Sequence, residues 1–201
     1  MIFLIDGHSI AFRAFYALPE TLETKDGFPT NVIHGFLMML SKLVNNYEVE
    51  KIIIAWDVSK KTFRNEIFDD YKANRSSSPD NFKIQIKKLQ SLLVKFNLPQ
   101  VSLEGYEADD VLGSLASEYN KKNKKVTIVT GDRDSFQLIS SKTHVMYTKR
   151  GISDVEIYDS NLFTEKYQIS TNQYVEYLAL KGDKSDNIPG LPGVGEKTAI
   201  S

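Results

Sequence analysis

Nine carboxylates fall in five short segments of this chain, and their spacing suggests a shared chemistry. The densest segment is "YEADDV", residues 106–111, in which Glu107, Asp109 and Asp110 crowd beside apolar Val111. Carboxylates this close repel one another and cannot all ionise without counter-charge. Hard divalent cations take oxygen ligands and supply that charge. The segment therefore indicates a magnesium or manganese site, provided that the other acids converge on it.

Four further acids lie at the ends of three apolar segments that have the composition of buried parallel strands. Asp6 ends "MIFLID", and Asp57 ends "KIIIAWD". Asp132 and Asp134 follow "KVTIVTG". Ligands of open parallel sheets bind beyond the carboxyl ends of the strands. This pattern therefore predicts that the four carboxylates meet at one edge of a sheet.

Glu107 and Asp110 are three residues apart, and so are Asp183 and Asp186 in "GDKSDN". A helical turn would place each pair on one face. Taken singly, each acid has a structural explanation, because aspartates form turns and acids favour the first turn of a helix. The joint pattern instead favours two divalent ions. Roughly 4 Å apart, such ions activate a water and stabilise the leaving oxygen of a phosphodiester.

A basic segment, "KKTFRNEIFDDYKANR" at 60–75, follows closely after Asp57. On a helix, its basic and aromatic side chains would share about a third of the circumference: Lys61, Arg64, Phe68, Tyr71, Lys72 and Arg75. A solvated amphipathic helix is the structural alternative. The functional hypothesis is a face that grips phosphates and stacks on bases of a single strand.

A Gly/Pro-rich loop, "IPGLPGVGEKTA" at 188–199, carries Gly190, Gly193 and Gly195 just before a predicted helix. Backbone amides in such a turn can bind phosphate oxygens without reading bases. The loop lacks the spacing of an ATP-binding loop or a dinucleotide fingerprint. It follows an apolar helix ("NQYVEYLALKG"), which is the layout of a helix-hairpin-helix.

The elements that must position these residues alternate between strand and helix. Helical patterns cover 30–46, 80–97 and 107–123, and "THVMYT" at 143–148 is a weaker fourth strand. Alternation of this kind predicts a three-layer α/β/α fold with a mostly parallel central sheet. We expect an α/β core at 1–157, with a basic helical arch at about 58–80. Residues 158–201 are expected to be the start of a helical helix-hairpin-helix region that is truncated.

Composition narrows the chemistry further. The chain has 201 residues, a net charge of -1 and no cysteine, which excludes disulfides and thiolate metal sites. Its three histidines, His8, His34 and His144, are scattered and do not predict a histidine-rich metal site. The apolar start is too short for a signal peptide or a membrane span, so a cytoplasmic protein without membrane contact is expected.

Five stretches resemble the 5'-nuclease (flap endonuclease) domain found at the N-terminus of bacterial DNA polymerase I. They occur in the family's order and span nearly the whole chain: "LIDGHSIAFRAFYAL", "AWDVSKKTFRNEIFDDYKANR", "GYEADDVLGSLA", "TGDRDSFQLI" and "ALKGDKSDNIPGLPGVGEKTA". The resemblance implies a fold of the PIN or 5'-nuclease-like type, with residues 1–157 as the nuclease core. It also implies a 5'-3' exonuclease and flap endonuclease that acts in DNA replication and repair with two Mg²⁺, which Mn²⁺ can replace.

The resemblance also implies roles for individual residues. The first metal site would comprise Asp6, Asp57, Glu107, Asp109 and Asp110. The second would comprise Asp132, Asp134, Asp183 and Asp186. Arg64, Lys72 and Arg13 would hold the scissile phosphate. DNA contacts would come from Lys61, Phe63, Tyr71, Arg75, Gly190, Gly193, Gly195 and Lys197, with K⁺ at the hairpin.

The implied partner is DNA with a 5' flap, a nick or an RNA-primer end, bound by a monomer at the bacterial nucleoid. A polymerase region would follow in the natural chain. Two departures from the family stand out. His8 replaces what is more often a small serine, and the chain stops at Ser201, as the second hairpin helix begins.

Two other functions remain as alternatives. A DNA-binding relative without metals would have lost acids of the second site, yet all nine acids are present. A ribonuclease of the related PIN type usually has fewer acids and no hairpin motif. "GLPGVGEKTA" argues against that alternative.

Overall fold

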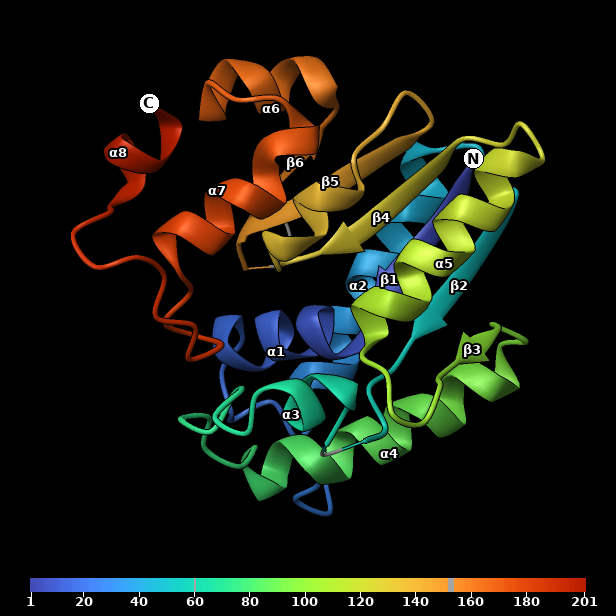
Figure 1. The fold of residues 1–201 in the computed structure, drawn as a ribbon. Helices are drawn as coiled ribbons and strands as arrows, with labels where there is room; N and C mark the ends of the chain where they lie inside the picture. The colour runs from blue at the N-terminus through green and yellow to red at the C-terminus, as the bar shows by residue number, and fades with distance from the viewer. Residues whose placement is uncertain (60, 152–153) are drawn as a thin grey trace.

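The centre of the molecule is a six-stranded sheet with the order β3-β2-β1-β4-β5-β6. The computed structural model describes residues 1–59, 61–151 and 154–201 (Figure 1). The sheet is parallel except for β6, which pairs antiparallel with β5. The strands are β1 (Ile2–Asp6), β2 (Lys51–Ala55), β3 (Gln100–Val101), β4 (Val126–Thr130), β5 (Thr143–Arg150) and β6 (Asp154–Tyr158).

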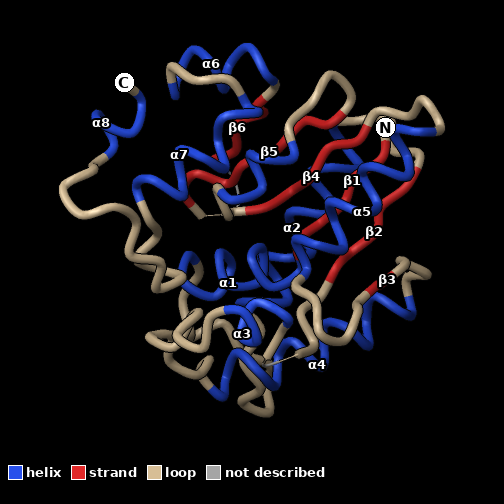
Figure 2. Tube along the Cα trace, in the orientation of Figure 1, coloured by secondary structure: helices blue, strands red, loops and turns tan. Residues whose placement is uncertain are grey.

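Helices cover both faces of this sheet (Figure 2). They are α1 (Gly7–Ala17), α2 (Asn31–Asn46), α3 (Phe63–Ile67), α4 (Asp80–Lys95), α5 (Ala108–Lys121), α6 (Ser160–Tyr167), α7 (Tyr174–Lys181) and α8 (Glu196–Ile200), with 3-10 turns η1 (Asp134–Leu138) and η2 (Thr171–Gln173). Alternate residues of β1 face opposite sides, as the pleat requires. Phe3 and Ile5 pack with α1, α2 and α4. Ile2 and Leu4 pack with α5, α6 and α7.

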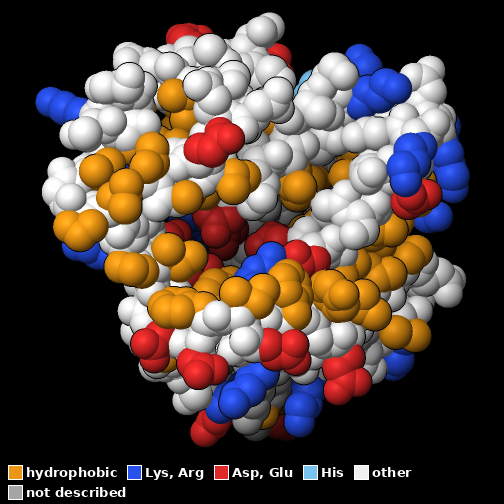
Figure 3. Space-filling view, viewed as in Figure 1, with side chains coloured by type: hydrophobic (Ala, Val, Ile, Leu, Met, Phe, Trp, Pro, Cys, Tyr) orange, Lys and Arg blue, Asp and Glu red, His pale blue; other side chains and the backbone are white. Residues whose placement is uncertain are grey.

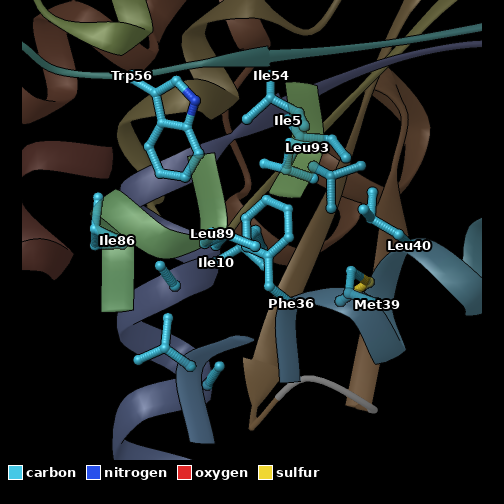
Figure 4. Packing of buried hydrophobic residues seen from close by; sticks show 14 of the residues in the cluster. Ile5, Ile10, Phe36, Met39, Leu40, Ile54, Trp56, Ile86, Leu89 and Leu93 are labelled. Atoms are coloured by element: carbon cyan, nitrogen blue, oxygen red, sulfur yellow. The ribbon is translucent and has the colours of Figure 1, made fainter. Parts of the chain in front are cut away.

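The packing under α1 and α2 fixes the strand end that carries Asp57. Phe36 of α2 stacks on Trp56 with ring centroids 5.9 Å apart, and both rings are buried (Figure 4). The indole N–H of Trp56 donates to Gln100 Oε1 at 2.9 Å. Burying side chains of this size contributes on the order of 2 kcal/mol each. Asp57 therefore directly follows a residue that is fixed in the core.

A buried polar pair ties α1, α2 and α4 together. Gln85 Nε2 donates to Asn31 Oδ1 at 2.9 Å, and Gln85 Oε1 accepts the Val32 N–H at 2.9 Å. The amide nitrogen of Asn31 also donates to the carbonyl of Phe15 at the end of α1. Because buried polar groups that lack partners are costly, this network fixes how the three helices meet.

The predicted fold class is confirmed, and so are strands at 1–6, 51–57, 125–132 and 143–148. Strands β3 and β6 were not predicted. The expected helix over the basic segment is wrong, because α3 ends at Ile67 and Lys72 has a left-handed φ of 56°. Tertiary contacts with a later loop override the helical pattern there. Lys60, the first residue of that segment, lies outside the described residues. Among the described helices, none is long and apolar enough to cross a membrane.

Candidate active site

The floor of the site begins at Asp6, the last residue of β1 and the N-cap of α1. Asp6 Oδ1 accepts the Ser9 N–H at 3.0 Å, and Oδ2 accepts the Thr130 hydroxyl at 2.9 Å. The residue is only 6% exposed. Burial, reinforced by the charges of Asp57 and Asp132, raises the pKa of Asp6 to about 6. The environment therefore disfavours its ionisation unless a cation is near.

Asp57 and the start of α5 lie next to it. Asp57 Oδ1 accepts the Ala108 N–H at 2.8 Å, and Oδ2 is 3.3 Å from His8 Nδ1. Burial alone would raise the pKa of Asp57, but the contacts with His8 and Ala108 lower it. Glu107 is the N-cap of α5, and its N–H donates to Asp110 Oδ2 at 3.0 Å. Part of the acid crowding is therefore helix capping, as the structural explanation allowed.

Two further acids are held where burial opposes ionisation. Burial and the charges of Asp6 and Asp132 raise the pKa of Asp109 well above its usual range. Burial and the charges of Asp132 and Asp186 raise the pKa of Asp134 to about 7. These mutual effects mean that acids from separate segments share one region, as the strand-end pattern predicted.

Asp183 and Asp186 form a tight turn rather than a helical one, and their carboxylates have different partners. Asp183 accepts the Ser185 N–H at 2.6 Å and the Ser185 hydroxyl at 2.7 Å. Burial would raise the pKa of Asp183, but these hydrogen bonds lower it. Asp186 is 6% exposed and accepts the Tyr71 hydroxyl at 3.1 Å. Of these two acids, Asp186 is the one whose carboxylate contacts the described residues of the basic segment.

The arch, residues 58–80, places cations directly on the acids. Arg64 forms a two-pronged pair with Asp110, with N–O distances of 2.7 and 2.8 Å. This pair is the main reason that the pKa of Asp110 is lowered. Lys72 Nζ lies 2.7 Å from Glu107 Oε2. In this conformation, arginine and lysine side chains of the arch thus supply the positive charge that the crowded carboxylates need.

The end of the arch is also bonded to the loop that carries Asp186. Arg75 forms an ion pair with Asp186, and the Lys72 N–H donates to the Asp186 carbonyl at 3.0 Å. Asn74 Nδ2 donates to the Lys184 carbonyl at 2.7 Å. The arch and this loop, more than a hundred residues apart in the sequence, therefore move as one unit unless these bonds break.

The aromatic residues expected to contact DNA differ in their availability. Tyr71 is 8% exposed, and its hydroxyl lies 3.1 Å from Asp186 Oδ2 and 3.2 Å from Glu107 Oε2, so these two carboxylates share its single proton. In this conformation its ring is not open for stacking. Phe63 is 37% exposed and packs against Arg64, whose guanidinium lies 4.7 Å from the ring centre. Phe63 is therefore the more accessible of the two rings.

Arg13 and Lys61, two further expected contacts, lie in contrasting surroundings. Arg13 Nη2 donates to the Gly131 carbonyl at 3.1 Å, and Nη1 donates to the Lys149 carbonyl at 3.4 Å. A Cβ on Gly131 would lie 2.5 Å from Arg13 Nε, so a larger residue there would displace this arginine. Lys61 is exposed at the base of the arch.

The hairpin glycines have separate roles. Gly190 has φ of 64°, and a Cβ there would meet the Gly182 nitrogen at 2.5 Å. It is therefore required by the turn itself. A Cβ on Gly193 or Gly195 would meet nothing within 4 Å, so the backbone there is open. Lys197 is exposed one residue after α8 begins. The open part of the hairpin is thus 193–197.

A cleft of about 1330 Å³ lies between the acids and the arch. Its walls include Asp6, Asp57 and Asp132 on the acid side and Lys72 and Arg75 on the arch side. Figure 3 shows acidic side chains at the bottom of a hollow near the centre of the molecule, with basic atoms at its rim. An anionic chain could therefore approach the acids only alongside these cations.

The donor set suits hard divalent ions. Carboxylate oxygens are the ligands that Mg²⁺ and Mn²⁺ prefer, and Mg²⁺ usually keeps several waters and takes one or two carboxylates. Among the described residues, no three acidic or histidine side chains are placed to ligate one ion together. Arch contacts to Asp110, Glu107 and Asp186 occupy three of the carboxylates instead. Direct ligation by those three requires the arch cations to withdraw.

Sequence reasoning missed the residues that hold the acids. Ser9 Oγ accepts the Gly131 N–H at 2.8 Å and Thr130 binds Asp6, so both fix the strand ends. Ser135 donates to Asp109 at 3.3 Å. Hydroxyl residues next to strand ends are common in loops, so the sequence offers no distinctive signal for them.

The whole chain matches two family models in succession. Residues 1–168 match "5'-3' exonuclease, N-terminal resolvase-like domain", and residues 169–201 match "5'-3' exonuclease, C-terminal SAM fold". The chain belongs to the 5'-3' exonuclease family, a family of nucleases.

Among individual relatives, the chain is 44% identical over 199 residues to DNA polymerase I of Mycobacterium tuberculosis. It is 45% identical over 197 residues to DNA polymerase I of Bacillus caldotenax. Each alignment covers 98% of this chain and 22% of the relative, so the chain spans about a fifth of these proteins.

Solved structures share the fold at low identity. A bacteriophage T5 flap endonuclease in complex with DNA and metal ions superposes with a TM-score of 0.81 at 21% identity, covering 99% of this chain and 72% of the other. Human GEN1 in complex with Holliday junction DNA gives 0.65 at 16% identity, covering 99% and 48%. These likenesses support the three-layer architecture.

Proposed function

We propose that this chain hydrolyses DNA phosphodiesters as a structure-specific 5'-3' exonuclease and flap endonuclease, in flap or primer removal during replication and in repair. The observation that carries the proposal is a single cleft lined by the acids Asp6, Asp57, Glu107, Asp109 and Asp132 and by Lys72 and Arg75 of the arch. Asp134 is close enough to Asp132 and Asp186 for their charges to raise its pKa. The DNA and metal ions in the T5 relative support the same assignment.

Two divalent ions, Mg²⁺ or Mn²⁺, would supply an activated water and charge stabilisation for the leaving oxygen. One would be held by Asp6, Asp57, Glu107, Asp109 and Asp110, and the other by Asp132, Asp134, Asp183 and Asp186. The protein's own task is to bring these carboxylates together before substrate arrives. Asp6, Asp109 and Asp134, whose pKa values are raised, gain most from a cation because burial and neighbouring acids disfavour their ionisation.

The arch would hold the substrate once its cations leave the acids. Arg64 and Lys72 now pair with carboxylates, and a phosphodiester offers the same two-oxygen acceptor geometry to an arginine. Arg13 also lines the cleft. Together these three groups can orient the scissile phosphate over the acids. Lys61, Phe63, Tyr71 and Arg75 would contact the flap.

The hairpin would hold the duplex arm through backbone amides at Gly190, Gly193 and Gly195 and through Lys197, with K⁺. Because 193–197 is open, contact to phosphates there needs no rearrangement of the turn. The proposed substrate is DNA with a 5' flap, a nick or an RNA-primer end. A polymerase region in the natural chain, a monomeric state and a cytoplasmic location belong to the same proposal.

The test is cleavage of a 5'-end-labelled flap duplex with Mg²⁺, with Mn²⁺ and with chelator. We expect metal-dependent cuts near the junction, lost in Asp110→Asn and Asp132→Asn but kept in Asp26→Asn, a control on an exposed loop. Full activity of either site variant would refute the metal assignment. Binding without cleavage by the wild type would instead favour a DNA-binding module.

A separate test addresses the arch. Lys72→Ala combined with Arg75→Ala should slow flap cleavage and flatten the dependence of binding on salt, since each lost phosphate contact reduces that slope. Unchanged cleavage and an unchanged slope would show that the arch does not hold the flap.

A further inference from the structure

His8 lies at the wall of the cleft, beside the acids but outside the set of metal ligands. It is the second residue of α1, and its side chain is 24% exposed. Its ring meets Trp56 edge to face, with centroids 5.2 Å apart at 87°. Phe82 lies 6.4 Å away on α4. Two aromatic neighbours therefore hold the ring at one side and leave the other toward the cleft.

The hydrogen bonding of His8 fixes which nitrogen is free. Nδ1 accepts the backbone N–H of Asp57 at 3.3 Å. Asp57 Oδ2 lies at the same distance from Nδ1, so Asp57 engages this nitrogen through two atoms. In the described part of the chain, Nε2 has no hydrogen-bond partner. His8 thus presents an unused ring nitrogen at the cleft wall, and an anionic oxygen that accepts a hydrogen bond there selects the ring form with a proton on Nε2.

We propose that His8 Nε2–H binds a phosphate oxygen of the substrate strand, at the phosphodiester next to the scissile one on the flap side. The inference deepens the proposed nuclease function and rests on it. An anionic acceptor fits because Arg13, Lys72 and Arg75 line the same cleft. A donor beside Asp57 would hold a strand that the carboxylates themselves repel. His8 is then a substrate-positioning residue that acts by binding.

The two nitrogens of His8 can be separated by substitution. Asparagine places its amide close to Nδ1, so His8→Asn keeps an acceptor for the Asp57 N–H and loses the donor in the cleft. Glutamine reaches the position of Nε2, so His8→Gln keeps that donor and loses the Nδ1 contact. His34→Asn makes the same chemical change on the exposed surface of α2 and serves as the control.

The first measurement is KM and kcat for a 5' flap duplex with Mg²⁺. We expect His8→Asn to raise KM about tenfold, the effect of one lost hydrogen bond to a charged group, with little change in kcat. His8→Gln should retain most of the binding. If His8 only orients Asp57, the pattern reverses: His8→Gln loses kcat and His8→Asn does not. That reversal would overturn the proposal.

A second substrate locates the contact. A neutral methylphosphonate at the phosphodiester next to the scissile one should raise KM about tenfold for the wild type. It should have little further effect on His8→Asn, because contacts that share a partner are not additive. Equal penalties in both proteins would refute a contact at that phosphate. A penalty that follows base identity instead would point to contact with a base edge.

Failure of the nuclease assignment can be told apart from failure of this contact. Fluorescence anisotropy in chelator gives Kd for the same labelled flap without cleavage. A wild type that binds but does not cut would refute the nuclease function, while weaker binding by His8→Asn alone would still support the contact. Equal Kd and KM for the wild type, His8→Asn and His34→Asn would refute it.

Discussion

Asp134 should destabilise the protein at neutral and alkaline pH when divalent ions are absent. Its pKa rises from 3.8 to about 7 because of burial and the charges of Asp132 and Asp186. Between these two pH values the folded state binds more protons than the unfolded state. The free energy of unfolding therefore falls as the pH rises from about 4 to about 7.

The size of the effect follows from the shift. A rise in pKa from 3.8 to about 7 is equivalent to about 4 kcal/mol, at roughly 1.4 kcal/mol per pH unit. Asp134 is only partly buried, so water screens part of this energy. We expect Asp134→Asn to raise the free energy of unfolding at pH 8 by about 2 kcal/mol. At pH 4 the same change should have little effect.

Urea denaturation with chelator, at pH 4 and pH 8, measures both values. Asp26→Asn on an exposed loop is the control for removal of one charge. Adding Mg²⁺ at pH 8 should stabilise the wild type by about 2.7 kcal/mol at a hundred times Kd. The asparagine variant should gain less. A variant that is no more stable than the wild type at pH 8 would refute the reasoning.

Three further predictions concern stability. Arg64→Gln should lower the urea midpoint by an amount equivalent to about 1 kcal/mol, since the pair with Asp110 is partly exposed; an unchanged midpoint would mean that the pair contributes nothing. Gly190→Ala should cost more than Gly193→Ala in thermal unfolding, because both have positive φ but only Gly190 has backbone at 2.5 Å; equal costs would contradict the steric argument. Phe136→Ala, which empties a fully buried position, should cost about 3–5 kcal/mol, and a loss below about 1 kcal/mol would show that the core refills.

The sequence predicts the central strands because they are continuous apolar runs that end in acid. It does not predict β3, which has two residues and no periodicity, or β6, the antiparallel strand after β5. A two-residue strand is defined by its neighbour, here β2, and not by its own pattern. The sequence therefore predicts a strand or helix where packing requires a long apolar pattern. It does not predict a short strand that exists only because it pairs with a neighbouring strand.

The site shows the same division. The convergence of Asp6, Asp57 and Asp132 follows from strand direction and could be predicted. The conformation of the arch could not, because Lys72 leaves the helical region to bond a loop whose sequence is more than a hundred residues away. Long-range hydrogen bonds of this kind leave no local periodicity. They decide which carboxylates are paired with protein cations.

The pairing of the arch with the acids has a consequence for how the protein matures. Arg64, Lys72 and Arg75 neutralise Asp110, Glu107 and Asp186 from within the chain. A newly synthesised chain can therefore fold this region without first binding a metal ion. An ion that binds one of these three carboxylates must first displace an arginine or a lysine, so its apparent affinity there is lower than at an unpaired carboxylate. With a lower affinity, these carboxylates would bind the divalent ion that is abundant in the cell and would not bind ions that are present in trace amounts.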